Sequence, residues 1–398
     1  MTGALTIEDQ LLVSGAHPVL SAERERGMSR LLALGPDWSR LVADAERHGL
    51  AALLHGHLCA PGVAGVPAAI RESLARSAWT CVAWNLRLRH ELGRLLTAFD
   101  RGRVAVMPLK GPVLADQLYP DPMLRSTGDL DLLVRSADRR AAEKILQGLG
   151  CRRLPAREQG TDYHTVFVSD DGDAAGEVLV ELHHELGERH VSGPDVRAIW
   201  DRASPSAWAG LPIWSMALPD LLVYLCFHAA KDGLASLRAL LDITLLIERH
   251  RGEIPWAEVT ARARAAHVAS PVYLSLGQSR ALLGAPVPEA VLGALRPCRL
   301  GWGLSLRLFR WRGGVLHVPQ ERLVGPFMAI LMILWEDSPR RRLRQVQRNL
   351  LPSPRLRERW TDVGPAAPWV RWYPVWLWCA VRQAARQLRT RPRDAGCC

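Results

Sequence analysis

Two aspartates one residue apart, Asp129 and Asp131, are the side chains in this 398-residue sequence best spaced to do chemistry. Leu130 separates them and the apolar run 132–134 follows, a pattern typical of a buried β-strand. Because residues i and i+2 of a strand point to the same face, the two carboxylates would project together. Paired carboxylates are ligands for a hard divalent cation such as Mg²⁺, so the pair predicts metal-assisted chemistry.

A lysine–glycine pair, Lys110-Gly111, precedes the aspartates, with Gly111 eighteen residues before the first of them. The stretch 104–109 is strand-like and a helix-like stretch follows, so the pair would occupy a strand-to-helix turn, an arrangement that binds phosphate. Lysine is otherwise rare, because of 51 basic residues only Lys110, Lys144 and Lys231 are lysines. Chance would explain this as well, but a compact ammonium suits point-charge contact with a phosphate. The two features together suggest chemistry on a nucleoside triphosphate.

A third carboxylate, Glu181, lies in another strand-like segment and shares a face with His183. If this strand neighbours the first, three carboxylates converge, a set that can hold two Mg²⁺ ions about 3.5–4 Å apart for phosphoryl or nucleotidyl transfer. Glu181 could instead act mainly as the base that deprotonates the acceptor. The alternative for the aspartate pair is a solvated strand edge without a metal.

Further polar residues near these positions are weaker candidates. Arg125 and Ser126 lie four and three residues before Asp129, where an arginine can bind phosphate through two parallel hydrogen bonds. A surface arginine is the alternative. For His183 we favour a buried core histidine over a neighbour of the metal. Three residues on later helices could face the same cleft or serve the structure alone: His228, Lys231 and Asp242.

The elements that must position these residues follow from hydrophobic periodicity. Four regions are expected: a helical region at 1–95, an α/β core at 96–204, a helical domain at 205–350 and an Arg/Trp-rich helical tail at 351–398. Within the core, strands are expected at 104–109, 129–134, 164–168 and 178–182, with helices at 112–119 and 137–149. This order predicts an α+β fold with a small mixed β-sheet flanked on both sides of the sequence by helices.

Composition narrows the class of protein. The chain is 48% hydrophobic and 23% charged, as is usual for globular proteins. Eight scattered cysteines without a CxxC pair, no signal-like N-terminus and no apolar run of about 18 residues predict a cytoplasmic protein without a transmembrane segment. The net charge of +11 resides in the last quarter, because residues 296–398 carry 20 arginines and 6 acidic residues. The remainder of the chain carries a net charge of about −3.

At these residues the sequence resembles the polymerase-β-like nucleotidyltransferase superfamily, and more closely its poorly characterised bacterial "nucleotidyltransferase family" branch. The resemblance covers roughly residues 96–250 and is specific as a set. Its motifs are Leu109-Lys110-Gly111, the loop Tyr119 to Pro122, Arg125, Asp129 to Val134, Glu181-Leu182-His183, Leu218-Pro219-Asp220, His228, Lys231 and Asp242-Ile243. The wider superfamily uses a Gly-Ser pair where this chain has Lys110-Gly111, and often Asp where it has Glu181.

The resemblance implies a small mixed-sheet nucleotidyltransferase core and Mg²⁺-dependent transfer of a nucleoside monophosphate from an NTP, usually ATP, to a hydroxyl or other acceptor. It assigns catalysis and metal binding, with two Mg²⁺ ions, to Asp129, Asp131 and Glu181. The NTP would be bound by Lys110, Gly111, Arg125 and Ser126. Some members of the branch belong to biosynthetic clusters for ribosomally made peptides such as lasso peptides, so the acceptor is a small molecule, a peptide or a protein.

Three other functions remain open from the sequence. The protein could bind nucleotides without transferring them, as a regulatory protein on the same fold. The basic C-terminus with interleaved tryptophans could bind single-stranded nucleic acid, although amphipathic helices with solvated arginines are the simpler interpretation. The same residues, 369–391, could attach the protein loosely to a membrane surface.

Overall fold

The computed structural model describes residues 5–155, 163–169, 176–187, 192–297, 302–311, 313–317 and 326–350. These residues form helices around one mixed five-stranded sheet and a separate two-stranded hairpin, which confirms the expected α+β class. Among them, no helix combines the length and apolarity needed to cross a membrane. The Arg/Trp-rich tail at 351–398 lies outside the described residues.

The N-terminal part of the chain is helical, as expected. Its four short helices are α1 (Ile7–Ser14), α2 (Ala22–Leu32), α3 (Trp38–Arg47) and α4 (Ala51–Leu58). The first three begin where a side-chain oxygen of Thr6, Ser21 or Asp37 accepts a hydrogen bond from a backbone N–H of the first turn. Leucines on these helices are buried in the same core as helices far along the chain.

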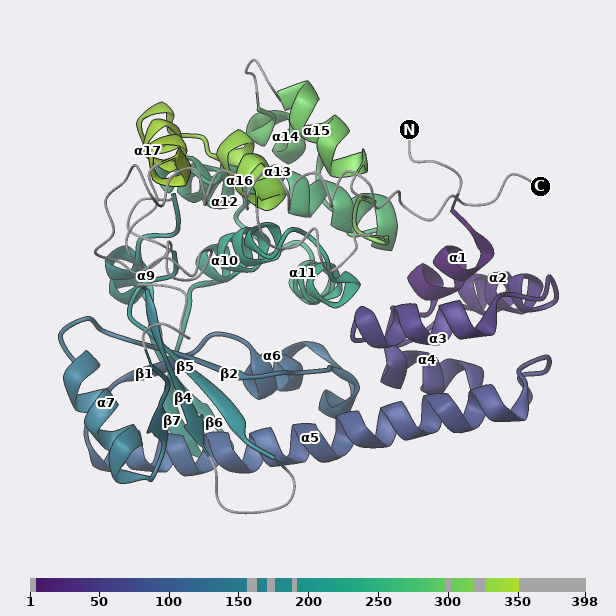
Figure 1. Ribbon diagram of the computed structural model, residues 1–398, viewed down its shortest axis with the longest axis horizontal. Helices are drawn as coiled ribbons and strands as arrows, with labels where there is room; N and C mark the ends of the chain where they lie inside the picture. Colours follow the sequence, from purple (N-terminus) through teal and green to yellow (C-terminus); the bar gives the residue numbers. More distant parts are fainter. Residues whose placement is uncertain are drawn as a thin grey trace, which may run out of the picture.

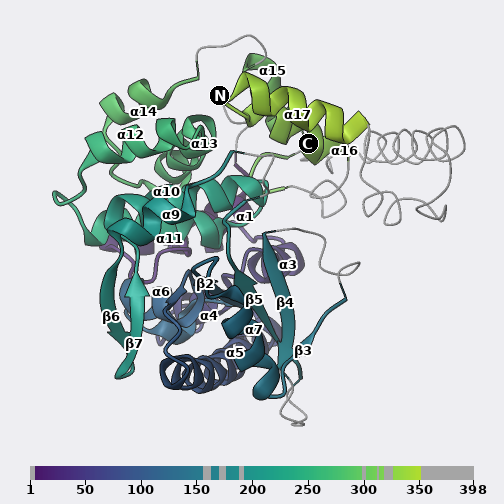
Figure 2. The same ribbon diagram turned by 90° about the vertical axis from the view of Figure 1, so that its left-hand side faces the viewer.

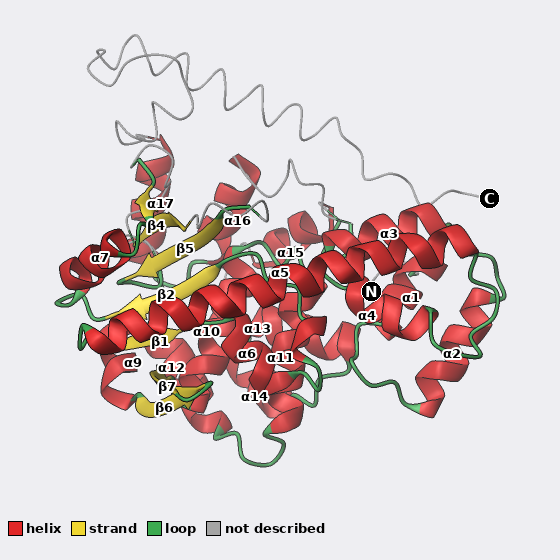
Figure 3. Ribbon diagram, turned by 90° about the horizontal axis from the view of Figure 1, so that it is seen from below, coloured by secondary structure: helices red, strands yellow, loops and turns green. Residues whose placement is uncertain are grey.

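Helix α5 (Ala68–Arg101) is the longest element of the described structure and crosses the boundary expected at residue 95. With 34 residues it spans about 51 Å at 1.5 Å per residue. It runs along the lower edge of Figure 1, beneath the N-terminal helices and then beneath the sheet. Seen from below, it crosses in front of the strands (Figure 3). Its second half buries Leu88, Leu95 and Phe99 against the sheet.

The main sheet has the order β1-β2-β5-β4-β3. Its strands are β1 (Val106–Pro108), β2 (Leu130–Val134), β3 (Arg152–Arg153), β4 (His164–Ser169) and β5 (Val178–His183). Only β2 and β5 pair in parallel, while the other pairs are antiparallel, so the sheet is mixed as expected. Figure 2 shows β4 beside β5, and Figure 3 shows β1, β2, β5 and β4 in this order. The short strand β3 was not expected from the sequence.

The two faces of the sheet differ in chemistry. One face presents apolar side chains such as Leu132, Val180 and Phe167, which pack with α5 and with α7 (Arg139–Gly148). The opposite face presents Asp131 and Glu181, because side chains alternate along each strand. Period-2 alternation therefore separates a closed apolar core from a polar face that can serve as a site.

The expectation that helices resume at residue 205 is wrong at its start. Helix α9 (Val196–Arg202) leads into the hairpin β6 (Ser204–Trp208) and β7 (Leu211–Ser215). Two residues, Ala209 and Gly210, connect the strands with φ angles of 50° and 79°. Positive φ at both central residues is typical of a tight hairpin turn whose twist matches the strands. The Ala-Gly pair is a weaker hairpin signal than Asn-Gly, which is why the sequence did not reveal it.

Helices form the rest of the described chain. They are α6 (Gly111–Leu118), α10 (Leu218–Lys231), α11 (Leu237–Arg249), α12 (Trp256–Ala265), α13 (Ala269–Gln278), α14 (Glu289–Leu295), α15 (Trp302–Trp311), α16 (Pro326–Trp335) and α17 (Pro339–Leu350), with the short turns η1 (Pro122–Leu124) and η2 (Ser279–Leu283). Helix α16 consists of apolar residues, and its Leu331 and Trp335 are buried.

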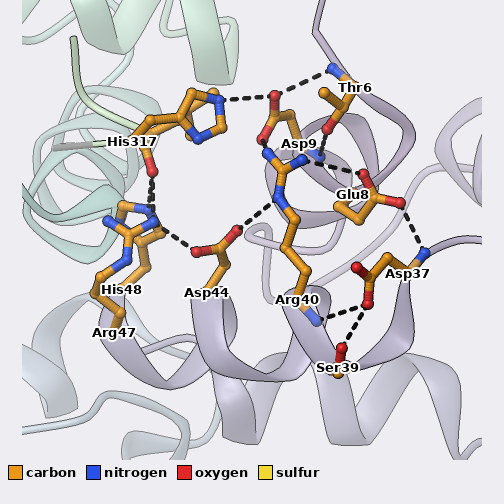
Figure 4. Close-up of polar contacts among 11 residues, drawn as sticks. Thr6, Glu8, Asp9, Asp37, Ser39, Arg40, Asp44, Arg47, His48 and His317 are labelled. Carbon is orange, nitrogen blue, oxygen red and sulfur yellow. Dashed lines mark hydrogen bonds and ion pairs between the residues drawn. The ribbon is translucent and has the colours of Figure 1, made fainter. Parts of the chain in front are cut away.

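Polar contacts join the N-terminal helices to the segment after α15 (Figure 4). His317 Nε2 lies 3.0 Å from Asp9 Oδ2, which also accepts the backbone N–H of Thr6. Arg47 and His48 both contact the carbonyl oxygen of Leu316. The beginning and the later part of the described chain are therefore held together by side chains as well as by a common apolar core.

Candidate active site

The candidate site is built on two parallel neighbouring strands. In the pairing of β2 with β5, Asp131 lies directly opposite Glu181. Asp129 precedes β2 by one residue and completes a group whose carboxylate oxygens lie within 4.8 Å of one another. The convergence of three carboxylates, expected if the strands were neighbours, is therefore observed. Their roles as metal ligands and catalytic groups stay predictions.

Lys110 ends the loop before α6 and points into this group. Its Nζ lies 2.9 Å from Asp131 Oδ2 and 2.8 Å from His228 Nε2. Gly111 begins α6 with a φ of 64°, a conformation that glycine adopts without the strain that other residues incur. The glycine thus lets the chain turn sharply from β1 into α6 and leaves the lysine at the edge of the carboxylate group.

A chain of hydrogen bonds holds Lys110 from behind. His228 Nδ1 lies 3.0 Å from Asp232 Oδ2, so the ring connects the ammonium of Lys110 to a second carboxylate. Burial lowers the pKa of His228, and the positive charge of Lys110 adds to this effect. A neutral ring can accept from Lys110 at Nε2 while donating to Asp232 at Nδ1. His228 was expected to face the cleft or to serve the structure, and it does support a residue of the cleft.

The surroundings shift the pKa values of Asp129 and Asp131 in opposite directions. Burial and the nearby charge of Asp131 raise the pKa of Asp129 to about 6. Burial also opposes ionisation of Asp131, but Lys110 and His183 outweigh it and hold the pKa of Asp131 well below its usual value. The environment therefore stabilises one carboxylate firmly as an anion and disfavours a second negative charge beside it.

His183 is a buried residue of the sheet that also contacts the carboxylates. Its Nε2 lies 3.0 Å from Asp131 Oδ1 and 3.2 Å from Glu181 Oε2. Burial favours the neutral ring, but the hydrogen bonds to these two carboxylates outweigh burial and raise the pKa of His183. The opposing strand contributes His164, whose Nδ1 lies 3.6 Å from Glu181 Oε2. His164 was not identified from the sequence as a site residue, because its place beside Glu181 depends on the register of β4 against β5.

A basic cavity of about 280 Å³ adjoins Lys110. Its lining includes four cationic side chains, Arg47, Lys110, Arg125 and Arg238, and two acidic ones, Asp232 and Asp242. Arg238 lies in the first turn of α11, next to Ser236, which precedes the helix. An excess of positive charge at a helix N-terminus suits a polyanionic ligand. Arg47, Arg238 and Asp232 were not recognised from the sequence, because no motif includes them and only the folded chain brings them to one cavity.

Arg125 makes a buried ion pair rather than leaving its donors free for phosphate. Its Nε and Nη2 donate to Asp242 at 3.0 and 2.8 Å, and its Nη1 donates to Thr127 Oγ1. Arg125 is 2% exposed, so the alternative of a surface arginine is wrong. Tyr119 donates to the same carboxylate of Asp242 at 2.9 Å. The phosphate contact predicted for Arg125 stays a prediction, while the geometry gives it a role in joining η1 to α11.

Two further predicted residues lie apart from the carboxylate group. Ser126 lines a different cavity, together with Gly49 and Cys81 beside α5. Lys231 donates to the hydroxyl of Tyr163 at 2.9 Å and lies 4.8 Å from the centre of that ring. Tyr163 in turn stacks on His183, with ring centres 5.9 Å apart. Lys231 therefore supports the histidines through an aromatic residue.

A comparison with protein-family models shows the family of this chain. Residues 35–284, more than half of the chain, match the model described as an uncharacterised nucleotidyltransferase. The chain belongs to this nucleotidyltransferase family. It is accordingly an enzyme of the transferase class, and the family implies an NTP as substrate. No curated protein and no solved structure gives a significant match. The matched segment includes all of α5, most of which precedes residue 96, where the resemblance based on motifs begins.

Proposed function

We propose that this nucleotidyltransferase moves a nucleoside monophosphate from an NTP, with ATP as the expected donor, to a hydroxyl group of a small molecule, a peptide or a protein. The observation that carries the proposal is the pairing of Asp131 opposite Glu181 with Asp129 alongside, all three gathered at the polar face of the sheet. Family membership supports nucleotidyl transfer, and the carboxylate group supports its dependence on a divalent cation.

The donor set fits the metal that the resemblance implies. Asp129, Asp131 and Glu181 offer carboxylate oxygens within 4.8 Å of one another, and Mg²⁺ prefers oxygen ligands. These residues would hold one or two Mg²⁺ ions. When bound, Mg²⁺ supplies positive charge to the phosphate oxygens of the donor and of the departing pyrophosphate.

The chain's own cations would bind the triphosphate. Lys110 lies between the carboxylates and the basic cavity, so it can contact a phosphate while Asp131 remains ionised. Arg238 and Arg47 line the cavity beyond it and would bind the distal phosphates. A lysine here replaces the serine that the wider superfamily uses, and charge rather than a hydroxyl hydrogen bond would hold the donor.

The acceptor would approach from the side of Glu181. The side chain of Glu181 is 27% exposed, whereas that of Asp131 is 3% exposed. An acceptor hydroxyl can therefore reach Glu181, which would take its proton as the general base. Ribosomally made peptides and hydroxyl-bearing small molecules are the acceptor classes to be tested first.

The proposed transfer is tested by following a radioactive label from the NTP into an acceptor. The protein is incubated with Mg²⁺, a pool of candidate peptides and metabolites, and an NTP labelled at the α- or the γ-phosphate. We expect label from the α-phosphate to enter an acceptor, and Asp129→Asn and Asp131→Asn to abolish this transfer. Mass spectrometry of the labelled product then identifies the acceptor and the added nucleotide.

Other outcomes favour other functions. Transfer of γ-label instead would show that the protein is a kinase on this fold. Mg²⁺-dependent NTP binding without any transfer would favour the second candidate, a nucleotide-binding regulatory protein. The closed contact between Lys110 and Asp131 is the observation that favours this second candidate, because it neutralises a carboxylate without a metal. Absence of both binding and transfer would refute the proposed function.

A further inference from the structure

Two histidines lie on the same sheet face as the carboxylates, and no role in nucleotidyl transfer requires them. In the antiparallel pairing of β4 with β5, His164 lies directly opposite His183. Glu181 lies two residues before His183 and therefore on the same face. The strand register alone thus brings two imidazole rings and one carboxylate together, at a position adjacent to the three-carboxylate group.

The distances between the donor atoms suit a shared ion. His183 Nε2 lies 3.2 Å and His164 Nδ1 lies 3.6 Å from Glu181 Oε2. The ligand atoms of His164, Glu181 and His183 all lie within 4.8 Å of one another. Donors around an ion at metal–ligand distances of about 2.0–2.2 Å are separated by roughly 3–3.6 Å. The group therefore needs little rearrangement to surround an ion.

Both imidazole rings are buried and are packed against an aromatic side chain. His164 is 7% and His183 is 3% exposed, so solvent competes little for their nitrogens. Tyr163 packs edge-on against His164 and stacks on His183, with ring centres 4.6 and 5.9 Å apart. Lys231 fixes Tyr163 through its hydroxyl. An aromatic side chain packed against the two rings restricts the access of water and helps to orient the ligands.

We infer that His164, His183 and Glu181 form a second metal position that takes a divalent transition metal, such as Mn²⁺ or Zn²⁺, in preference to Mg²⁺. Imidazole nitrogen suits transition metals, whereas Mg²⁺ requires oxygen. Glu181 belongs to both groups and would bridge this ion to one held by Asp129 and Asp131. The inference goes beyond the proposed transfer reaction and does not depend on it, because it rests on the pairing of β4 with β5.

The decisive measurement detects nitrogen bound to the metal. The full chain is loaded with Mn²⁺, and pulsed electron paramagnetic resonance records ¹⁴N modulation of the bound ion. We expect ¹⁴N coupling in the wild-type protein, and its persistence in excess Mg²⁺. In parallel, competition with a chromophoric chelator measures Zn²⁺ affinity, which His164→Gln and His183→Gln should each weaken by more than about a hundredfold.

Controls separate this site from the proposed function and from unfolding. Asp129→Asn should retain the ¹⁴N coupling, because Asp129 belongs only to the carboxylate group, although it should lose nucleotidyl transfer. His90→Gln removes an exposed histidine on α5 and should leave Zn²⁺ affinity unchanged. The wild-type spectrum needs no variant, so a misfolded mutant cannot obscure the answer. Bound Mn²⁺ without ¹⁴N coupling, or complete displacement of Zn²⁺ by Mg²⁺, would overturn the inference.

Discussion

The ammonium of Lys110 lies 2.9 Å from Oδ2 of Asp131, where the chain turns from β1 into α6. The contact joins the two halves of the motif, the lysine–glycine turn and the paired aspartates. It also places a cation where a bound phosphate would share it with Asp131. The variants below test that relationship and the residues that support it.

The carboxylates at the polar face of the sheet are the first target for mutation. Asp131→Asn preserves the size of the side chain but removes a charge that the site stabilises, so we expect nucleotidyl transfer to fall by roughly a thousandfold or more. Initial rates of α-label transfer measure the loss. Asp100→Asn, an exposed residue at the end of α5, is the matched control and should retain full activity. Equal activity of the two variants would contradict a role for Asp131 in catalysis.

Lys110 should matter for donor binding. Lys110→Met removes the charge that faces the basic cavity, and a lost charge-assisted hydrogen bond of about 1.5–3 kcal/mol corresponds to roughly 10–100-fold weaker NTP binding. Isothermal titration calorimetry with a non-hydrolysable NTP measures this. Lys144→Met changes an exposed lysine on α7 and should leave the dissociation constant unaltered. Unchanged affinity in Lys110→Met would exclude the phosphate contact.

The pair Arg125–Asp242 should contribute to stability more than to donor binding. Arg125→Met leaves a buried carboxylate to which, among the described residues, only Tyr119 still donates a hydrogen bond, so the free energy of unfolding should fall by about 3–5 kcal/mol. The double variant Arg125→Met/Asp242→Leu should recover much of this loss. Urea unfolding gives both values. The exposed pair Arg152–Glu177 offers a control, because Arg152→Met should cost less than about 1 kcal/mol.

His48 predicts a dependence of stability on pH. Its Nδ1 accepts the backbone N–H of Leu237 and its Nε2 contacts the carbonyl of Leu316, so both nitrogens serve the neutral ring. Burial lowers the pKa of His48 to about 4 from an ordinary value of 6.5. Because the unfolded chain takes up the proton first, the stabilisation is complete above pH 6.5 and is lost as the pH falls towards 4.

Urea unfolding at several pH values tests this dependence. Between pH 6.5 and 4, His48 should contribute a slope of up to about 1.4 kcal/mol per pH unit, and His48→Gln should remove that part. His17, whose pKa burial also lowers to about 4, should add a similar slope. His90→Gln, at an exposed site on α5, should leave the slope as it is. A wild-type slope equal to that of His48→Gln would refute the assignment.

The sequence predicted well those parts of the fold that depend on local patterns. Alternation of apolar and acidic residues located β2 and β5 to within a residue or two, and with them the faces of Asp131 and Glu181. The carboxylates meet because these two strands pair in parallel. The alternation of residues along each strand could not predict that the strands are neighbours. Likewise, Gly111 followed by Pro112 correctly marked the start of α6.

What the sequence could not predict depends on contacts between distant segments. The partner of Arg125 lies 117 residues later, so the sequence could not reveal the ion pair between Arg125 and Asp242. His164 joins the site only through the register of β4 against β5. Asp232 matters only because α10 brings His228 against Lys110. The periodicity of apolar residues does not show which distant residues come into contact.

The apolar core shared by both ends of the described chain restricts how this enzyme can be trimmed or transplanted. Leu11 and Leu54 from the N-terminal helices are buried in one cluster with Leu241 of α11 and Trp335 of α16. A recombinant fragment cut to the sheet and its nearest helices would expose these contact surfaces to water and would be prone to aggregation. Swapping the five-stranded sheet between relatives would therefore require exchanging the surrounding helices together with it.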